Sequence, residues 1–220
     1  MLGIVVPNSG FIDKKLNTMA LKTTVKINHV TNLSDARYCA GMGVEMIGFD
    51  LNKHHPNFVE AKKAQEIAGW LSGVSIVGEL THSPEIVLAD YPLDMLEVNS
   101  PNLFHEFVGS EAPLLYRFAV DNVETLAFAK EALESYRLSV NYFLIESSVL
   151  KINQQVADLL KQLSAEYPLL IGFGVTAANV HEVLDYVAPA GIALNGSPEI
   201  SAGLKDFDEL AEILEAIEIE

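Results

Sequence analysis

Short runs of apolar, β-branched and aromatic residues recur from position 24 onward, and each is followed by a stretch whose apolar residues have helical spacing. The runs predict eight strands, over 25–28, 46–50, 75–80, 95–98, 114–119, 142–146, 169–173 and 192–194. The stretches between them predict helices, among them 61–71, 123–133, 156–163 and 180–187. Strands separated by helices of this length form parallel βαβ units with right-handed crossovers. The fold class is therefore α/β, and eight units favour a closed (β/α)8 TIM barrel over the alternative, an open doubly wound sheet.

Local signals agree with this pattern. Asn32, with Asp35 three residues on, caps the helix after the first strand, and Thr176 is expected to cap the helix after the seventh. Gly41 and Gly43 end the first helix. No linker rich in Pro and Gly divides the chain, so residues 23–220 are predicted to form one barrel domain and residues 1–22 an N-terminal extension.

Composition narrows the function classes. The chain has 220 residues, 50% of them hydrophobic, and a formal net charge of −16, which argues against binding to nucleic acid or to an anionic membrane surface. Its apolar runs are too short to span a bilayer. A small phosphorylated metabolite stays possible, because backbone N–H groups at helix N-termini hold phosphate with few cations. A single cysteine, Cys39, excludes an internal disulfide and fits a cytoplasmic location.

Several segments resemble the phosphoribosylanthranilate isomerase family. Residues 26–37 read KINHVTNLSDAR, where the family has K-I-C-G-x-T and then N-x-x-D-A. Residues 56–59 read PNFV against S-P-R-Y-V, and residues 191–206 read GIALNGSPEISAGLKD against G-V-D-V-S-S-G-V-E-x-x-P-G-x-K-D. The similarity runs in order over all eight strands. It implies a (β/α)8 barrel, and an isomerase that catalyses an Amadori rearrangement in tryptophan biosynthesis without a cofactor.

The resemblance also implies site residues. In the family's reaction an acid protonates the ribose ring oxygen and a base removes the C2′ proton. Glu146 stands at the position of the acid, while the base, a cysteine, is replaced by Asn28, whose amide has no useful basicity. Asn57 and Asn99 occupy substrate-binding positions where the family has arginine and histidine, and the aspartate of D-V-S-S-G is Ala193. We therefore expect weak or altered activity; the alternative is a non-catalytic binding or regulatory protein on an inherited barrel.

Two turns are candidates for phosphate binding. Gly174 follows the seventh strand, and Asn195, Gly196 and Ser197 follow the eighth, where barrels of this class often hold phosphate. Phe173 replaces the first glycine of the family's pair, at a place where the backbone approaches closely. The ordinary interpretation is two tight turns without a ligand.

Four histidines also fall at strand ends or in the loops that follow: His29, His54, His55 and His82. Their spacing matches no metal-binding motif, so we expect polar rim residues rather than a metal site. His29 could stand in as the base, but it directly follows Asn28, and the alternation of side chains along a strand predicts that it points elsewhere. Finally, Leu2, Ile4, Val5 and Val6 are expected to dock the N-terminal extension on the barrel or on a second copy of the chain, which makes a homodimer possible.

Overall fold

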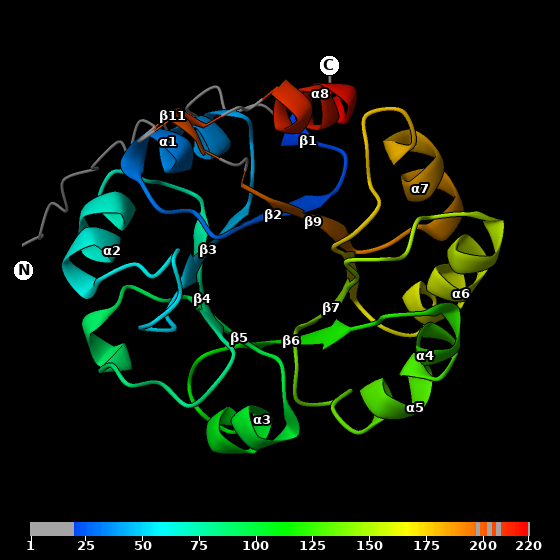
Figure 1. Ribbon diagram of the computed structural model, residues 1–220, viewed down its shortest axis with the longest axis horizontal. Helices are drawn as coiled ribbons and strands as arrows, with labels where there is room; N and C mark the ends of the chain where they lie inside the picture. Colours follow the sequence, from blue (N-terminus) through cyan, green and yellow to red (C-terminus); the bar gives the residue numbers. More distant parts are fainter. Residues whose placement is uncertain (1–19, 197–198, 202–203, 206–207, 220) are drawn as a thin grey trace, which may run out of the picture.

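The eight predicted strands close into a parallel barrel. A computed structural model describes residues 20–196, 199–201, 204–205 and 208–219. Its strands pair in the order β2-β3-β4-β5-β6-β7-β8-β9, with β9 returning to β2 (Figure 1). Their bounds are β2 Thr24–Asn28, β3 Met46–Asp50, β4 Ser75–Leu80, β5 Met95–Val98, β6 Leu114–Ala119, β7 Tyr142–Glu146, β8 Leu169–Ile171 and β9 Gly191–Asn195. The expected (β/α)8 fold class is thus confirmed.

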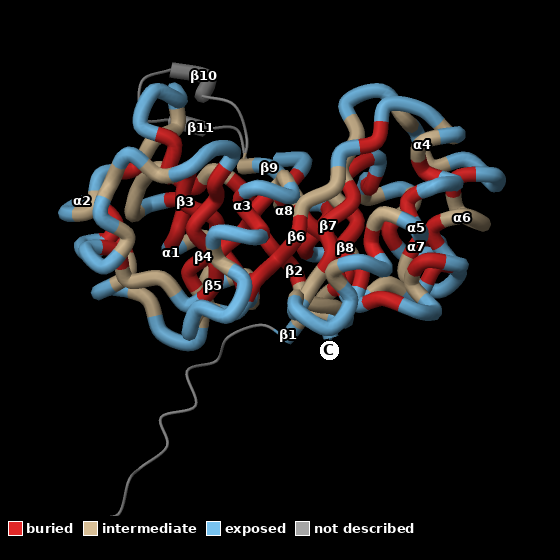
Figure 2. The backbone as a smooth tube through the Cα atoms, turned by 90° about the horizontal axis from the view of Figure 1, so that it is seen from below, coloured by how far each residue is buried: buried red, intermediate tan, exposed pale blue. Residues whose placement is uncertain are grey.

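Helices surround this ring of strands on the outside (Figure 1). They are α1 Leu33–Gly41, α2 Ala61–Ala68, α3 Pro101–Phe107, α4 Val123–Ala127, α5 Ala129–Glu134, α6 Gln154–Ser164, α7 Val180–Val187 and α8 Asp208–Ala216, with a 3-10 turn, η1, at Leu88–Asp90. The strands form the buried centre of the molecule and the outer helix faces are exposed (Figure 2). Most of the apolar core therefore lies between the barrel wall and the helices.

Some boundaries differ from the prediction. The seventh barrel strand, β8, ends at Ile171 and not at residue 173, and the helix predicted over 123–133 is broken into α4 and α5 at Phe128. Asn32 caps α1 by accepting from the backbone N–H of Asp35, as expected. Thr176 was the wrong cap for α7: the N-cap is Asn179, whose side chain accepts from the backbone N–H of Thr176.

The barrel interior is apolar at one end and charged toward the other. Alternate strand positions place a layer of apolar side chains at the amino-terminal end: Met46, Val77, Met95, Leu115, Leu144, Leu170 and Ala193. Two buried carboxylates, Glu79 and Glu97, come two residues further along β4 and β5, and a buried lysine, Lys26 of β2, is in register with Met46 and Ala193. TIM barrels usually fill all interior layers with bulky apolar residues. Burying a charged layer below the carboxyl-terminal rim costs desolvation free energy. Its presence therefore indicates a functional site above it, at the mouth of the barrel.

The two ends of the described chain pair with each other as two short strands outside the barrel sheet. Strand β1, Ala20–Leu21, pairs antiparallel with β12, Glu218–Ile219, and Lys22 N–H donates to the carbonyl of Ile217. A second short pair, β10 Glu199–Ser201 and β11 Leu204–Lys205, follows β9. The docking predicted for Leu2, Ile4, Val5 and Val6, like the role of Ser197, lies outside the described residues, and the boundary at residue 22 stays a prediction. No helix in the described part is long and apolar enough to cross a membrane.

Candidate active site at the carboxyl-terminal mouth of the barrel

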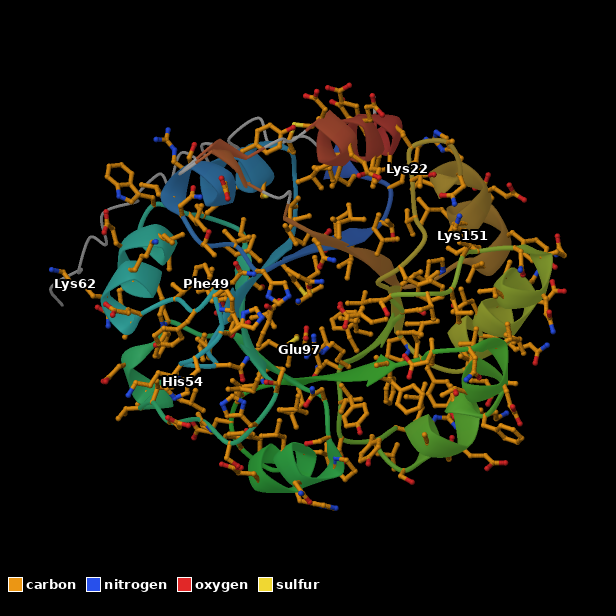
Figure 3. The ribbon with its side chains drawn as sticks, in the orientation of Figure 1. Lys22, Phe49, His54, Lys62, Glu97 and Lys151 are labelled. Carbon is orange, nitrogen blue, oxygen red and sulfur yellow. The ribbon has the colours of Figure 1, made fainter. Side chains whose placement is uncertain are left out.

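A completely buried lysine organises the charged layer. Lys26 Nζ lies 2.6 Å from Glu79 Oε1 and 2.9 Å from Glu97 Oε2, so it joins β2 to β4 and β5 across the barrel interior. Figure 3 shows Glu97 inside the ring of strands. Burial alone would raise the pKa of Glu79, but Lys26 and then His29 lower it to about 2. Burial works against the Lys26 charge, yet the two carboxylates raise its pKa overall. Lys26 and Glu79 therefore stay ionised and form a fixed layer of charge beneath the mouth of the barrel.

Arg117 connects this charged layer to the predicted acid. Its Nε lies 3.3 Å from Glu97 Oε1 and its Nη1 lies 3.3 Å from Glu146 Oε2. Glu146 is the last residue of β7, and its side chain is partly exposed at the mouth. Burial raises the pKa of Glu146, Arg117 opposes that effect, and Glu97 adds to it; the net direction is upward. A carboxyl that holds its proton more tightly than usual, at the rim of a barrel, is suited to general-acid work.

Asn28 is held firmly in place. Its Oδ1 accepts a short hydrogen bond from Lys26 Nζ, and its Nδ2 donates to Asn195 Oδ1 at 3.0 Å. Its carbonyl accepts from the N–H of Gly196 at 3.2 Å. Asn28 is 3% exposed, so its amide groups serve mainly to tie β2 to the turn after β9. The structure brings together the predicted residues Asn28, Asn195 and Gly196.

Two cavities open at this end of the barrel. One, of about 290 Å³, is lined by Glu146, Asp121, Ser147, Gly172 and Asn195, among others. The second, of about 340 Å³, shares three of these residues, Ser147, Gly172 and Asn195, and continues to Gly174, Gly196 and Glu209. Gly174 has φ 67°, which a residue with a side chain rarely adopts. The predicted phosphate turns therefore face a cavity contiguous with the one that Glu146 lines.

The other predicted binding residues lie apart from these cavities. Asn57 is in the loop after β3, where its N–H lies 3.3 Å from the ring of His55. Asn99 follows β5, and its buried Oδ1 has no hydrogen-bond partner among the residues that the structure describes. Neither residue lines the two cavities described above. An unpaired buried amide oxygen is costly, so Asn99 is available to a donor on a ligand.

The histidines divide into two groups. His54 and His82 are exposed, and His54 lies outside the ring of strands (Figure 3). His29 and His55 instead converge on Asp50: their Nδ1 atoms lie 3.6 and 2.7 Å from Asp50 Oδ2. No group of three or more His, Cys, Asp or Glu residues within the described ranges has the geometry to hold a metal ion.

Sequence reasoning missed Lys26 and Arg117 as parts of the site, although the alternation of side chains carried a usable signal. Lys26 is two residues before Asn28, and Arg117 stands at the same level of β6 as Leu144 of β7. Positions two apart on a strand face the same side, so Lys26 belongs to the interior with Asn28. A lysine in a run that is otherwise buried predicts a carboxylate partner.

Comparison of the sequence with known proteins finds similar enzymes but no matching family model. No family model matches the chain. N-(5′-phosphoribosyl)anthranilate isomerase of Aquifex aeolicus is 24% identical over 205 residues, covering 86% of this chain and 96% of that protein. The enzyme of the same name from Stutzerimonas stutzeri is 27% identical over 190 residues, covering 82% and 90%. This chain is thus similar to phosphoribosylanthranilate isomerases over most of its length.

Solved structures support the same fold. Phosphoribosylanthranilate isomerase from Thermotoga maritima superposes with a TM-score of 0.73 at 20% identity, covering 89% of this chain and 98% of that one. A structure of the isomerase in complex with reduced 1-(o-carboxyphenylamino)-1-deoxyribulose 5-phosphate, a phosphorylated ligand, gives a TM-score of 0.72 with the same coverage. Another structure describes the Thermotoga maritima enzyme as dimeric. The chain thus has the barrel fold of these enzymes.

Proposed function

We propose that this protein is an isomerase of the phosphoribosylanthranilate type, with activity on phosphoribosylanthranilate itself that is weak or altered. The observation that carries the proposal is Glu146: a carboxyl whose pKa is raised by burial, at the end of β7, beside a mouth cavity of about 290 Å³. Its position matches the acid of the family that the chain resembles. The relatives' shared name supplies the substrate class, a phosphorylated ribosylamine.

Glu146 is assigned the ring-opening step. Its protonated carboxyl gives its proton to the ribose ring oxygen as the bond from C1′ to that oxygen breaks, and the nitrogen lone pair forms a C1′=N bond. Arg117, 3.3 Å from Glu146 Oε2, then stabilises the carboxylate that remains. General-acid catalysis of this kind contributes roughly 10²–10⁴-fold.

Three replacements account for weak or altered activity. Asn28 cannot accept a proton at the position of the base. Asn57 provides no cation where the family has arginine, which removes a bidentate contact with an anionic group. Phe173, which is buried, stands where a glycine lets the backbone approach a phosphate.

The phosphate of the ligand is assigned to the cavity of about 340 Å³ that Gly174 and the turn at Asn195 and Gly196 line. The working form is assigned as a cytoplasmic homodimer, by analogy with the dimeric relative. Its solution mass is then twice the chain mass of 24.0 kDa.

The test combines growth and direct assay. The gene is introduced into a tryptophan auxotroph that lacks the isomerase, and the purified protein is assayed with phosphoribosylanthranilate under single-turnover conditions. We expect slow turnover that Glu146→Gln abolishes, while Glu131→Gln, at an exposed position on α5, leaves it unchanged. No turnover above the rate without enzyme would overturn the proposal.

One observation favours a second candidate, a non-catalytic binding protein. Asn28 is fully engaged by Lys26, Asn195 and Gly196, so the position of the family's base serves here as a structural tie. Calorimetric titration with reduced 1-(o-carboxyphenylamino)-1-deoxyribulose 5-phosphate, the ligand of the solved isomerase complex, distinguishes the two functions. Tight binding by a protein that shows no turnover identifies a binding protein, whereas turnover that depends on Glu146 identifies the enzyme.

A further inference from the structure

His29 is turned toward the barrel axis by an unusual backbone conformation. It follows the last residue of β2 and has φ 55°, in the left-handed region that non-glycine residues seldom occupy. In a continued strand its side chain would point away from that of Asn28. Instead its Nδ1 lies 2.9 Å from Glu79 Oε2 and 3.6 Å from Asp50 Oδ2, both interior groups. Strained residues of this kind concentrate at functional sites.

The contact with Glu79 sets which ring nitrogen carries the proton. Lys26 keeps Glu79 ionised, and its Oε2, 2.9 Å from Nδ1 of His29, electrostatically favours a proton on that nitrogen, which leaves the lone pair on Nε2. The ring is 28% exposed, so it stands at the mouth and not within the buried charged layer. A neutral imidazole with one nitrogen anchored and the other free is the usual arrangement of a general base.

His29 and Glu146 are the two ends of one chain of charged groups. The chain runs from Glu146 through Arg117, Glu97, Lys26 and Glu79 to His29, with the successive contacts between 2.6 and 3.3 Å. Both ends lie on the carboxyl-terminal rim, because the strands β2 and β7 are parallel members of one barrel. The carboxyl-terminal mouth therefore carries a proton donor, Glu146, and a potential proton acceptor, His29, joined by one network of ion pairs.

We propose that Nε2 of His29 is the base of this site. It takes over the role of the basic group that the family has at the position of Asn28. The proposal rests on the isomerase function above. After Glu146 has opened the ring, Nε2 removes the proton from C2′. The electron pair of that C–H bond forms the C1′=C2′ bond, and the π electrons of C1′=N move to nitrogen. The product of the step is a neutral enolamine, and the proton resides on His29 until it passes to solvent.

Asp50 and His55 position this base. Asp50 accepts from the backbone N–H and the side-chain Nδ2 of Asn52, at 2.9 and 2.8 Å, which fixes its carboxylate. The ring of His55 stacks on that of His29, with centroids 5.6 Å apart and an interplanar angle of 28°. His55 is the more exposed of the two rings, and its Nδ1 lies 2.7 Å from Asp50 Oδ2, so we assign it to positioning.

The charged groups that face His29 are Glu79 from β4, Asp50 from β3 and Lys26 from β2. The contact with Glu79 raises the pKa of His29, and Asp50 adds to that rise. Burial and the charge of Lys26 lower the pKa, but the net direction is upward. The rate therefore increases with pH at the acid end of the profile, as the imidazole loses its proton.

The experiment compares three histidine variants of the full chain, His29→Gln, His55→Gln and the matched control His82→Gln, whose ring is exposed at the rim. Single-turnover rates are measured across pH with phosphoribosylanthranilate. We expect His29→Gln to lower the rate roughly 10²–10⁴-fold, to leave KM within a few-fold, and to remove the rise of rate with pH. His55→Gln should lower it far less, and His82→Gln not at all. Added imidazole should partly restore a His29→Ala variant, which a purely structural role would not allow.

The outcomes separate this inference from the proposed function. If wild-type protein shows turnover that depends on Glu146, while His29→Gln keeps its rate and its pH dependence, the base assignment is wrong and the isomerase function stands. A larger loss of rate in His55→Gln than in His29→Gln likewise overturns the assignment of His29 as the base. Absence of any turnover in wild-type protein overturns the isomerase function instead. Thermal melting of each variant confirms that a lost rate does not reflect unfolding.

Discussion

A Cβ atom on Gly48 would lie 1.8 Å from Oε1 of Glu79, so the absence of a side chain on β3 creates the space for the buried carboxylate of β4. The same Cβ would lie 3.1 Å from Lys26 Nζ. The charged layer of the barrel therefore depends on one small residue, and its sequence neighbour Phe49 packs on the other face of the strand, in the core outside the barrel.

We predict that Gly48→Ala displaces Glu79 from Lys26 and destabilises the protein by about 3–5 kcal/mol, as expected when a buried ion pair is broken. Gly41→Ala is the matched control, because an added Cβ there meets nothing within 4 Å. Denaturant unfolding measures both variants. Equal midpoints for Gly48→Ala and wild type would show that the network adapts to the extra carbon.

Removal of the central cation should be equally costly. Lys26→Met leaves Glu79 and Glu97 buried and without their shared ammonium group, so we expect a loss of roughly 3–5 kcal/mol in the free energy of unfolding. Lys130→Met removes an exposed ion pair with Glu166 and should change stability by about 0–1 kcal/mol. A Lys26→Met protein as stable as Lys130→Met would contradict this account of the charged layer.

The response to acid follows from Glu79. Its pKa is about 2 in the folded protein against an ordinary 4.5, so the folded state binds this proton more weakly than the unfolded chain. The stabilisation is fully present above pH 4.5 and is lost as the pH falls toward 2. Glu79→Gln should therefore be clearly less stable than wild type at pH 6, with the difference shrinking toward pH 3. Glu111→Gln, which is exposed, should follow the wild-type curve.

Arg117 should control the alkaline side of the activity profile. It lowers the pKa of Glu146, while Glu97 and Glu79 raise it and Lys26 lowers it further. In Arg117→Met the pKa of Glu146 rises, so the acid keeps its proton to higher pH. The rate at alkaline pH should then increase relative to the rate at acid pH. Arg137→Met, on the surface beside Glu134, is the control. An unchanged ratio would show that Glu146 is not the titrating acid.

The sequence by itself determined the alternation of strands and helices, and with it the parallel barrel. It also placed Asn28, Glu146 and the turns at Gly174 and Asn195 at carboxyl-terminal strand ends, because side chains alternate with a period of two and parallel strands end at one rim. Five of the eight strands, such as Met46–Asp50 and Tyr142–Glu146, have the predicted bounds, since their apolar runs end sharply at polar residues.

Only the tertiary structure decided which of these residues meet. Lys26 reaches Glu97 on a strand that is not its neighbour, and such a contact depends on the radius and stagger of the closed barrel, which no local pattern encodes. The orientation of His29 depends on one left-handed φ angle, which overrides the alternation expected from its position after Asn28. The interior contacts with Glu79 and Asp50 stabilise that conformation, and they exist only once three strands have come together.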